Sequence, residues 1–194
     1  MGKPKAADHI LRKTAIDEFL SVCDTTEERL VFILTAFTGL RVSEFVHMRC
    51  SWIDVEDGVI RVPRHQPCSC AECIRKRGGV WKAKTDCAER PVPIVPECEG
   101  VIYDYFAGND SIMDTIPNRL KAWRVVKRLG ERIGTKSFPH ALRASFATLL
   151  SSYVPEELVV QQVMGWANLD MARFYIKHAG KTMKKKVISK WGKE

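Results

Sequence analysis

The sequence predicts a mainly α-helical domain that contains one small antiparallel sheet. Apolar residues recur at helical spacing along most of the chain, so helices are expected near residues 14–22, 25–38, 41–48, 98–106, 118–132, 140–152, 156–164 and 169–177. Strand-like alternation is found at Val59–Val62, directly after the turn pair Asp57-Gly58. Pro91–Val95 is the expected return strand, and its prolines predict an edge position.

The chain is expected to divide into an arm, one main domain and a C-terminal helix. Residues 1–13 are basic and weakly patterned, which is typical of an arm or linker. The main domain covers residues 14–180 and carries a cysteine-rich insertion, residues 64–90, between the two predicted strands. Residues 181–194 predict a short basic amphipathic helix, with apolar positions at Met183, Val187, Ile188 and Trp191.

Composition favours an intracellular globular protein with a polyanionic partner. The 194 residues are 45% hydrophobic and 28% charged, which is ordinary for a folded soluble domain. No apolar run approaches the ~20 residues of a membrane span, and the N-terminus has no apolar signal core, so a cytoplasmic protein without membrane contact is expected. The net charge of +8 favours nucleic acid as a partner, although a basic surface can also serve solubility alone.

The segment from Pro139 to Tyr175 collects side chains that suit an anion. His140 and Arg143 are three residues apart, so a helix places both on one face. Trp166 and Tyr175 follow on a later segment, after a glycine. Each residue alone has an ordinary structural explanation, but together they indicate an anion-binding site.

Four segments, in this order, resemble the boxes of the tyrosine recombinases, or phage integrases. Thr38–Glu44 (Thr-Gly-Leu-Arg-Val-Ser-Glu) is similar to the first arginine box, and Lys84–Pro93 is similar to the hairpin that carries a lysine. His140–Arg143 (His-Ala-Leu-Arg) is similar to the His-x-x-Arg box. Met164–Trp166 (Met-Gly-Trp), with Tyr175 nine residues after the tryptophan, is similar to the last box and the nucleophile. The resemblance implies that family's catalytic-domain fold.

The resemblance also implies a reaction and a role for each matching residue. Tyr175 would attack a DNA phosphodiester and form a 3′-phosphotyrosine, with the phosphate held by Arg41 and Arg143. Lys84 would protonate the leaving 5′-oxygen, with Lys82 as the alternative. His140 would accept a proton or hold the phosphate. Trp166 stands where His is commoner in the family, and its indole N–H can only donate, so it would bind phosphate without moving a proton.

The resemblance implies a site-specific recombinase or integrase, and the expected source is a virus, a plasmid or another mobile element. Its partner would be double-stranded DNA, with a homo-oligomer, expected to be a tetramer, on DNA and a monomer in solution. The chemistry would need no cofactor. The alternatives are a type IB topoisomerase and a DNA-binding regulator without activity. The C-terminal helix resembles a tail that relatives dock on a neighbouring protomer; packing on its own domain and contact with DNA are the alternatives.

The cysteines of the insertion predict a structural zinc site. Cys68, Cys70 and Cys73 lie within six residues, and Cys87 returns later in the same hairpin as the expected fourth ligand. His65 is the alternative fourth ligand. Free thiols, or a disulfide in a hyperthermophile, are the competing interpretations. The expected role of the metal is to stiffen a long hairpin that delivers Lys84.

Overall fold

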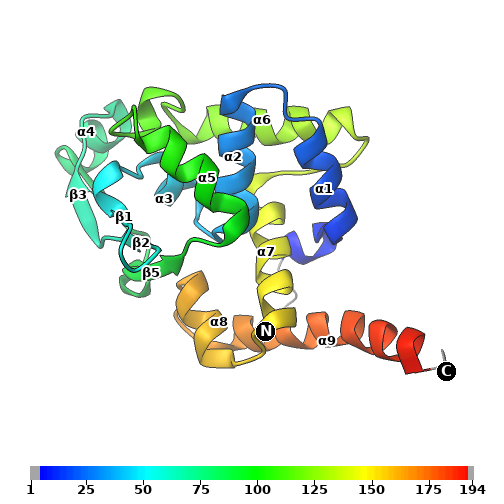
Figure 1. Ribbon diagram of the computed structural model, residues 1–194. Coiled ribbons are helices and arrows are strands. Elements are labelled where there is room, and N and C mark those ends of the chain that lie inside the picture. The colour runs from blue at the N-terminus through cyan, green and yellow to red at the C-terminus, as the bar shows by residue number, and fades with distance from the viewer. Residues whose placement is uncertain (1–4, 192–194) are drawn as a thin grey trace.

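Helix α2 (Thr26–Phe37) is the centre of the larger hydrophobic core. The computed structural model describes the backbone of residues 5–191 and the side chains of residue 6 and residues 8–180. Thr25 begins the helix by accepting a hydrogen bond from the Glu28 amide at 3.1 Å. The helix is apolar on nearly all sides, which is why it is buried on nearly all sides. It packs against α1 (Lys13–Ser21), α5 (Pro96–Phe106), α6 (Arg119–Arg132) and α7 (Pro139–Tyr153) (Figure 1).

A three-stranded antiparallel sheet lies at one side of this helical body. Its order is β1 (Ile53–Asp54), β2 (Val59–Val62) and β5 (Arg90–Pro93). The register pairs Ile60 with Val92, and both side chains are buried in the core. The predicted pairing of these two segments is confirmed, and the proline-containing strand does lie at the edge.

The cysteine-rich insertion folds into a small unit that its composition did not predict. Strands β3 (His65–Pro67) and β4 (Val80–Lys82) form a second antiparallel pair, and α4 (Ala71–Arg77) connects them (Figure 1). Trp81 of β4 is only 2% exposed and packs against Trp52, with ring centroids 5.3 Å apart. Burial of this indole holds the insertion against the main core.

A second, smaller hydrophobic cluster forms between α7, α8 (Glu157–Met164) and α9 (Leu169–Trp191). Figure 1 shows α7 running from the upper helices down to the layer that α8 and α9 form. Leu142 of α7 belongs to the larger cluster and Ala144 to the smaller one, so this helix joins the two. The fold is therefore mainly helical with small antiparallel sheets, as the sequence predicts.

Both ends of the chain differ from the sequence prediction. Part of the expected basic arm is packed: the 3₁₀ helix η1 (Lys5–His9) contacts α7, and the Leu11 amide donates to Ser145 Oγ at 2.8 Å. The predicted separate C-terminal helix continues α9 without a break to Trp191. The side chains on which its amphipathic character depends lie outside the described residues.

The remaining short elements are 3₁₀ helices at Cys50–Trp52 (η2), Asp86–Ala88 (η3) and Ile112–Asp114 (η4), and the helix α3 at Val42–Val46. Within the part of the chain that the structure describes, no helix combines the length and the apolar composition that a membrane span needs.

The basic face of α6 is largely occupied by ion pairs within the chain. Its cations pair with carboxylates of α2, α4 and α6 itself, in the pairs Lys121–Glu27, Arg128–Glu28, Arg119–Glu72 and Lys127–Glu131. These pairs are mostly solvent-exposed and contribute little stability. They do mean that the charge of this face is largely balanced before any partner binds.

Candidate active site

Arg41 stands immediately before α3, where Gly39 and Leu40 turn the chain after α2. One guanidinium nitrogen donates to Glu44 Oε1 at 2.7 Å, and the other donates to the carbonyl of Gly165 at 2.7 Å. Glu44 also accepts from the Arg41 amide at 2.8 Å. The guanidinium is therefore fixed from two sides while its side chain keeps 17% exposure.

Arg90 is a site residue that the sequence did not reveal. It is buried in β5 and donates to Glu44 Oε2 at 3.0 Å, to the Val163 carbonyl at 2.8 Å and to the Ala88 carbonyl at 2.7 Å. The alternation of the strand could have indicated its burial, because residue 90 shares a strand face with the buried Val92. An inward-facing arginine needs a buried carboxylate, and Glu44 is that carboxylate.

Glu44 is ionised because three arginines surround it. Burial alone would raise the pKa of this carboxyl, but the charges of Arg90, Arg143 and Arg41 outweigh burial and lower the pKa. The carboxylate is 1% exposed, so its charge acts on these guanidiniums rather than on solvent. Glu44 is thus the common anchor of the arginine group.

Arg143 of α7 connects the two hydrophobic clusters through backbone carbonyls. One guanidinium nitrogen donates to the Gly39 carbonyl, and the other donates to the Met164 carbonyl. Burial and the positive charge of Arg41 lower the pKa of Arg143 to about 9, which leaves the guanidinium charged at neutral pH. Gly39 has φ +63°, and a Cβ there would lie 2.7 Å from the Phe146 ring, so only glycine brings its carbonyl to this place.

His140 and Lys84 lie at the exposed side of the site. His140 lies in the first turn of α7, directly after Pro139, and is exposed. Its pKa is lowered by partial burial and by the charges of Arg143, Lys84 and Arg41, so the imidazole is neutral near pH 7. Lys84 lies in the loop between β4 and η3, and it is among these charges, whereas Lys82 is not.

Tyr175 lies in the smaller cluster, on the second turn of α9, and is 3% exposed. Its ring stacks on Trp166 with centroids 5.3 Å apart and planes 12° from parallel. Burial raises the pKa of the Tyr175 phenol, and the positive charge of Arg143 offsets part of that increase. At neutral pH the free protein therefore holds a neutral phenol within reach of the positive charge of Arg143.

One cavity of about 330 Å³ joins most of the predicted site residues. Its lining includes Arg41, His140, Arg143, Trp166 and Tyr175, which come from three separate regions of the sequence. Lys84 is not among the residues that line this cavity, but its charge helps to lower the pKa of His140. A phenol and an indole beside two guanidiniums form a place for a compact anion with several oxygen acceptors.

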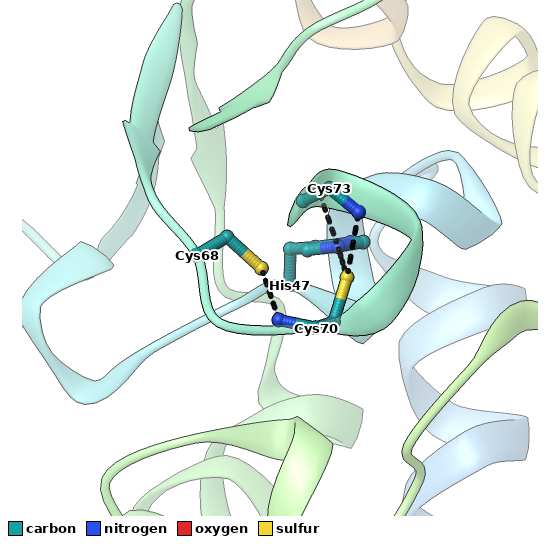
Figure 2. A group of neighbouring side chains, drawn as sticks. All are labelled: His47, Cys68, Cys70 and Cys73. Atoms are coloured by element: carbon teal, nitrogen blue, oxygen red, sulfur yellow. Dashed lines mark hydrogen bonds between the residues drawn. The ribbon is translucent and has the colours of Figure 1, made fainter. Parts of the chain in front are cut away.

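The cysteine prediction needs a correction in one ligand. Cys68, Cys70 and Cys73 do gather, but the fourth group beside them is His47, at the C-terminal end of α3 (Figure 2). Cys87 is exposed in η3, and His65 is exposed in β3; neither belongs to this group. The sequence missed His47 because it lies before the first strand, outside the insertion.

Comparison with known proteins gives the same family over nearly the whole chain. The model of the phage integrase family matches residues 9–182. The chain is 28% identical over 197 aligned residues to tyrosine recombinase XerA of Pyrococcus furiosus, covering 95% of this chain and 62% of the relative. It is 30% identical over 187 residues to XerA of Thermococcus onnurineus, covering 90% and 60%. The chain thus spans less than two thirds of the length of these curated relatives.

Solved structures share the fold. A crystal structure of XerA recombinase superposes with a TM-score of 0.69 at 20% identity, covering 91% of this chain and 62% of that one. The integrase of the Tn1549 transposon, in complex with transposon right-end DNA, gives a TM-score of 0.65 at 19% identity, covering 96% and 67%. With the family match over residues 9–182, these findings show that the chain belongs to the phage integrase family.

Proposed function

We propose that this chain is the catalytic domain of a site-specific DNA recombinase or integrase, which cleaves and rejoins strands through Tyr175. The observation that carries the proposal is the single cavity lined by Tyr175, both arginines, His140 and Trp166. The relatives it matches are recombinases and integrases, so the topoisomerase alternative gains no support from them.

The scissile phosphate would bind between Arg41 and Arg143. Each guanidinium has five N–H donors, and the carbonyls and Glu44 occupy only some of them. The free donors can bind the non-bridging oxygens, on which charge grows as the phosphorus is attacked. Trp166 would add an indole N–H. Because the guanidiniums are already fixed, they need little reorganisation in the transition state.

The nucleophile is the phenol oxygen of Tyr175, which must lose a proton before or during attack. Its raised pKa makes an acceptor necessary, and the neutral imidazole of His140 lines the same cavity. The new bond joins the phenol oxygen to phosphorus, and the bond from phosphorus to the 5′-oxygen breaks. The products are a 3′-phosphotyrosine and a free 5′-hydroxyl.

Lys84 is the proposed general acid for the leaving 5′-oxygen. Its charge reaches the site, since it contributes to the lowered pKa of His140, and its exposed loop can approach a bound duplex. Rejoining reverses each step, with a 5′-hydroxyl attacking the phosphotyrosine. The covalent link retains the energy of the phosphodiester, so the proposed reaction uses neither ATP nor a catalytic metal.

The proposed partner is double-stranded DNA, and the site of action is the cytoplasm in which that DNA lies. The Tn1549 integrase structures, solved with DNA, support this choice of partner, as does the net charge of +8. Exchange between two duplexes needs several active sites, so we propose a homo-oligomer, a tetramer, on DNA and a monomer in solution. Light scattering with and without DNA measures this.

Covalent trapping tests the proposal. Covalent protein–DNA adducts are first isolated from fragmented genomic DNA, and the bound sequences identify the cleavage position. Duplexes nicked near that position then release a short fragment on cleavage, which prevents rejoining, so the adduct accumulates. Tyr175→Phe removes one hydroxyl and keeps the ring packing, so it should bind DNA as the parent does yet form no adduct. Tyr153→Phe is the matched control, because Tyr153 is 70% exposed on α7 and should retain full adduct formation.

Adducts that persist in Tyr175→Phe would overturn the assignment of the nucleophile. Loss of adducts in both tyrosine variants would overturn it too, because the effect would then not be specific to the cavity. Thermal unfolding of each variant is measured as well. If Tyr175→Phe is as stable as the parent to within about 1 kcal/mol, the loss of adduct formation is due to the missing hydroxyl and not to unfolding.

A further inference from the structure

We propose that His47, Cys68, Cys70 and Cys73 bind one structural Zn²⁺ ion, which fastens the insertion to the helix that begins after Arg41. The four ligand atoms all lie within 4.8 Å of one another, and Figure 2 shows His47 beside the loop and helix that carry the three cysteines. His47 Nε2 is 3.7 Å from Cys70 Sγ and 3.6 Å from Cys73 Sγ. Ligands of a tetrahedral zinc, with bonds of ~2.0–2.3 Å, are about 3.5–3.8 Å apart.

The imidazole of His47 is prepared for a metal by its second nitrogen. His47 Nδ1 lies 2.8 Å from the Ser43 carbonyl, which can only accept, so the proton is on Nδ1. Nε2 then carries a lone pair and points at the sulfurs. In metal-binding histidines, the ring nitrogen that does not bind the metal usually donates a hydrogen bond to a carbonyl or carboxylate oxygen. The ring is also fixed by stacking on Trp81, with centroids 5.5 Å apart.

The sulfurs are arranged as metal ligands with backbone support. The Cys73 amide donates to Cys70 Sγ at 3.3 Å, and the Cys70 amide donates to Cys68 Sγ at 3.5 Å. Such N–H groups stabilise negative charge on sulfur, which a metal-bound thiolate carries. His47, Cys68 and Cys73 are buried, and Cys70 is half-buried. Four protein ligands complete a tetrahedron and leave no position for water, so the site is structural.

Zinc fits this ligand set better than the other common ions. Three thiolates with one imidazole are a typical structural zinc set, whereas magnesium and calcium take oxygen ligands. The close approach of all four ligand atoms matches a single ion. A disulfide between two of the cysteines would leave the third sulfur and the oriented imidazole unexplained.

The metal would tie together two parts of the chain that the active site needs. His47 directly follows the last residue of the short helix α3, and Arg41 directly precedes its first residue. The cysteines belong to the insertion, whose strand β4 leads into the Lys84 loop. Gln66 of β3 donates to the His47 carbonyl at 2.6 Å, and the Ala83 amide donates to the Arg64 carbonyl at 2.9 Å. The metal thus adds coordinate bonds to the packing, hydrogen bonds and ring contacts that already join them.

Metal content tests the site without reference to activity. The full chain, purified under reducing conditions, should contain about one zinc ion per chain. His47→Ala and Cys73→Ser should lose it, while Cys87→Ser and Cys50→Ser, at exposed thiols outside the group, should retain it. Because ligand variants can fail to fold, the parent chain is also stripped and titrated with Co²⁺. Tetrahedral cobalt d–d bands together with thiolate-to-cobalt charge transfer, complete at one equivalent, are expected.

A parent chain that binds neither zinc nor cobalt after anaerobic reduction would overturn the proposal. Zinc retained in both His47→Ala and Cys73→Ser would overturn it as well. Free thiols counted by a thiol reagent identify a disulfide, which is the competing outcome.

The proposed role of the metal rests on the proposed recombinase function, and a separate measurement tests it. The stripped chain should cleave an ordinary duplex more slowly, by up to the ~10²–10⁴-fold that a general acid contributes. A substrate with sulfur in place of the 5′-oxygen, which leaves without protonation, should be cleaved at nearly the parent rate. Equal slowing on both substrates contradicts the role in placing Lys84, yet leaves the metal site itself intact.

Discussion

Arg90 offers the most demanding test of how the site is held together. Replacing it with methionine keeps an unbranched, buried side chain and removes every N–H donor. The Val163 and Ala88 carbonyls then lose their partner, and Glu44 loses one of its cations. Breaking a buried ion pair from one side costs about 3–5 kcal/mol, and each unsatisfied carbonyl about 1–3 kcal/mol. These costs overlap because the groups are in contact.

We therefore expect Arg90→Met to lower the free energy of unfolding by at least about 3 kcal/mol, equivalent to a Tm lower by about 6 °C or more for a chain of this size. Urea unfolding followed by circular dichroism measures it. Arg61→Met is the matched control: Arg61 lies on the neighbouring strand β2, its side chain is 54% exposed, and it pairs with Asp54 and Asp57. That change should cost no more than about 1 kcal/mol.

The pH dependence provides a second readout of the same change. The folded-state pKa of Glu44 is lowered, so the stability that its ionisation contributes is fully present above the unfolded value of 4.5 and is lost as pH falls through the folded value. Without Arg90, burial is opposed by fewer charges and the pKa rises. Arg90→Met should therefore be less stable at neutral pH but should lose less additional stability than the parent as pH falls below 4.5, because the folded and unfolded pKa values of Glu44 differ less. A variant that matches Arg61→Met in both stability and acid sensitivity would refute the reasoning.

Two further predictions concern proton transfer. Lys84→Ala should slow cleavage by about 10²–10⁴-fold and be rescued by a 5′-thio substrate, whereas Lys82→Ala should have little effect; rescue of the Lys82 variant alone would exchange the two roles. In the free protein, an NMR titration should place the pKa of His140 below 6.5, because burial and three cations disfavour the imidazolium. Its neutral form adds stability above pH 6.5 that is lost as pH falls through the folded pKa, and a midpoint at or above 6.5 contradicts this arrangement.

The residues of the cavity could be predicted because each sits in a short local pattern. His140 and Arg143 share a helix face, and Gly165 interrupts the chain where α8 must end in a left-handed residue. Tyr175 follows on the second turn of the next helix, α9, where its side chain is buried. Local spacing fixes such positions, and packing only has to bring the patterns together.

Arg90 and His47 could not be found in this way, because their roles depend on distant partners. Arg90 looked like an ordinary strand residue until Glu44 was placed opposite it. His47 precedes the insertion, and contacts made after folding, such as Trp81 stacking on its ring and Gln66 donating to its carbonyl, accompany the approach of the cysteines. Cys87 looked equivalent to the other cysteines, but η3 turns it to solvent while its neighbour Ala88 is buried. Tertiary packing, rather than spacing, decided all three.

The hydrogen bonds of Arg143 change how a mutation at this position must be interpreted. The guanidinium that would bind phosphate also bridges the Gly39 carbonyl on one side of the cavity and the Met164 carbonyl on the other. Removing the guanidinium takes away a cation and at the same time breaks the hydrogen bonds that join Gly39, after α2, to Met164, at the end of α8. Lost activity in an alanine variant can therefore come from weaker phosphate binding, from weaker attachment of the α8–α9 layer, or from both. Only a separate measure of how the α8–α9 layer stays attached, such as amide exchange, divides the two.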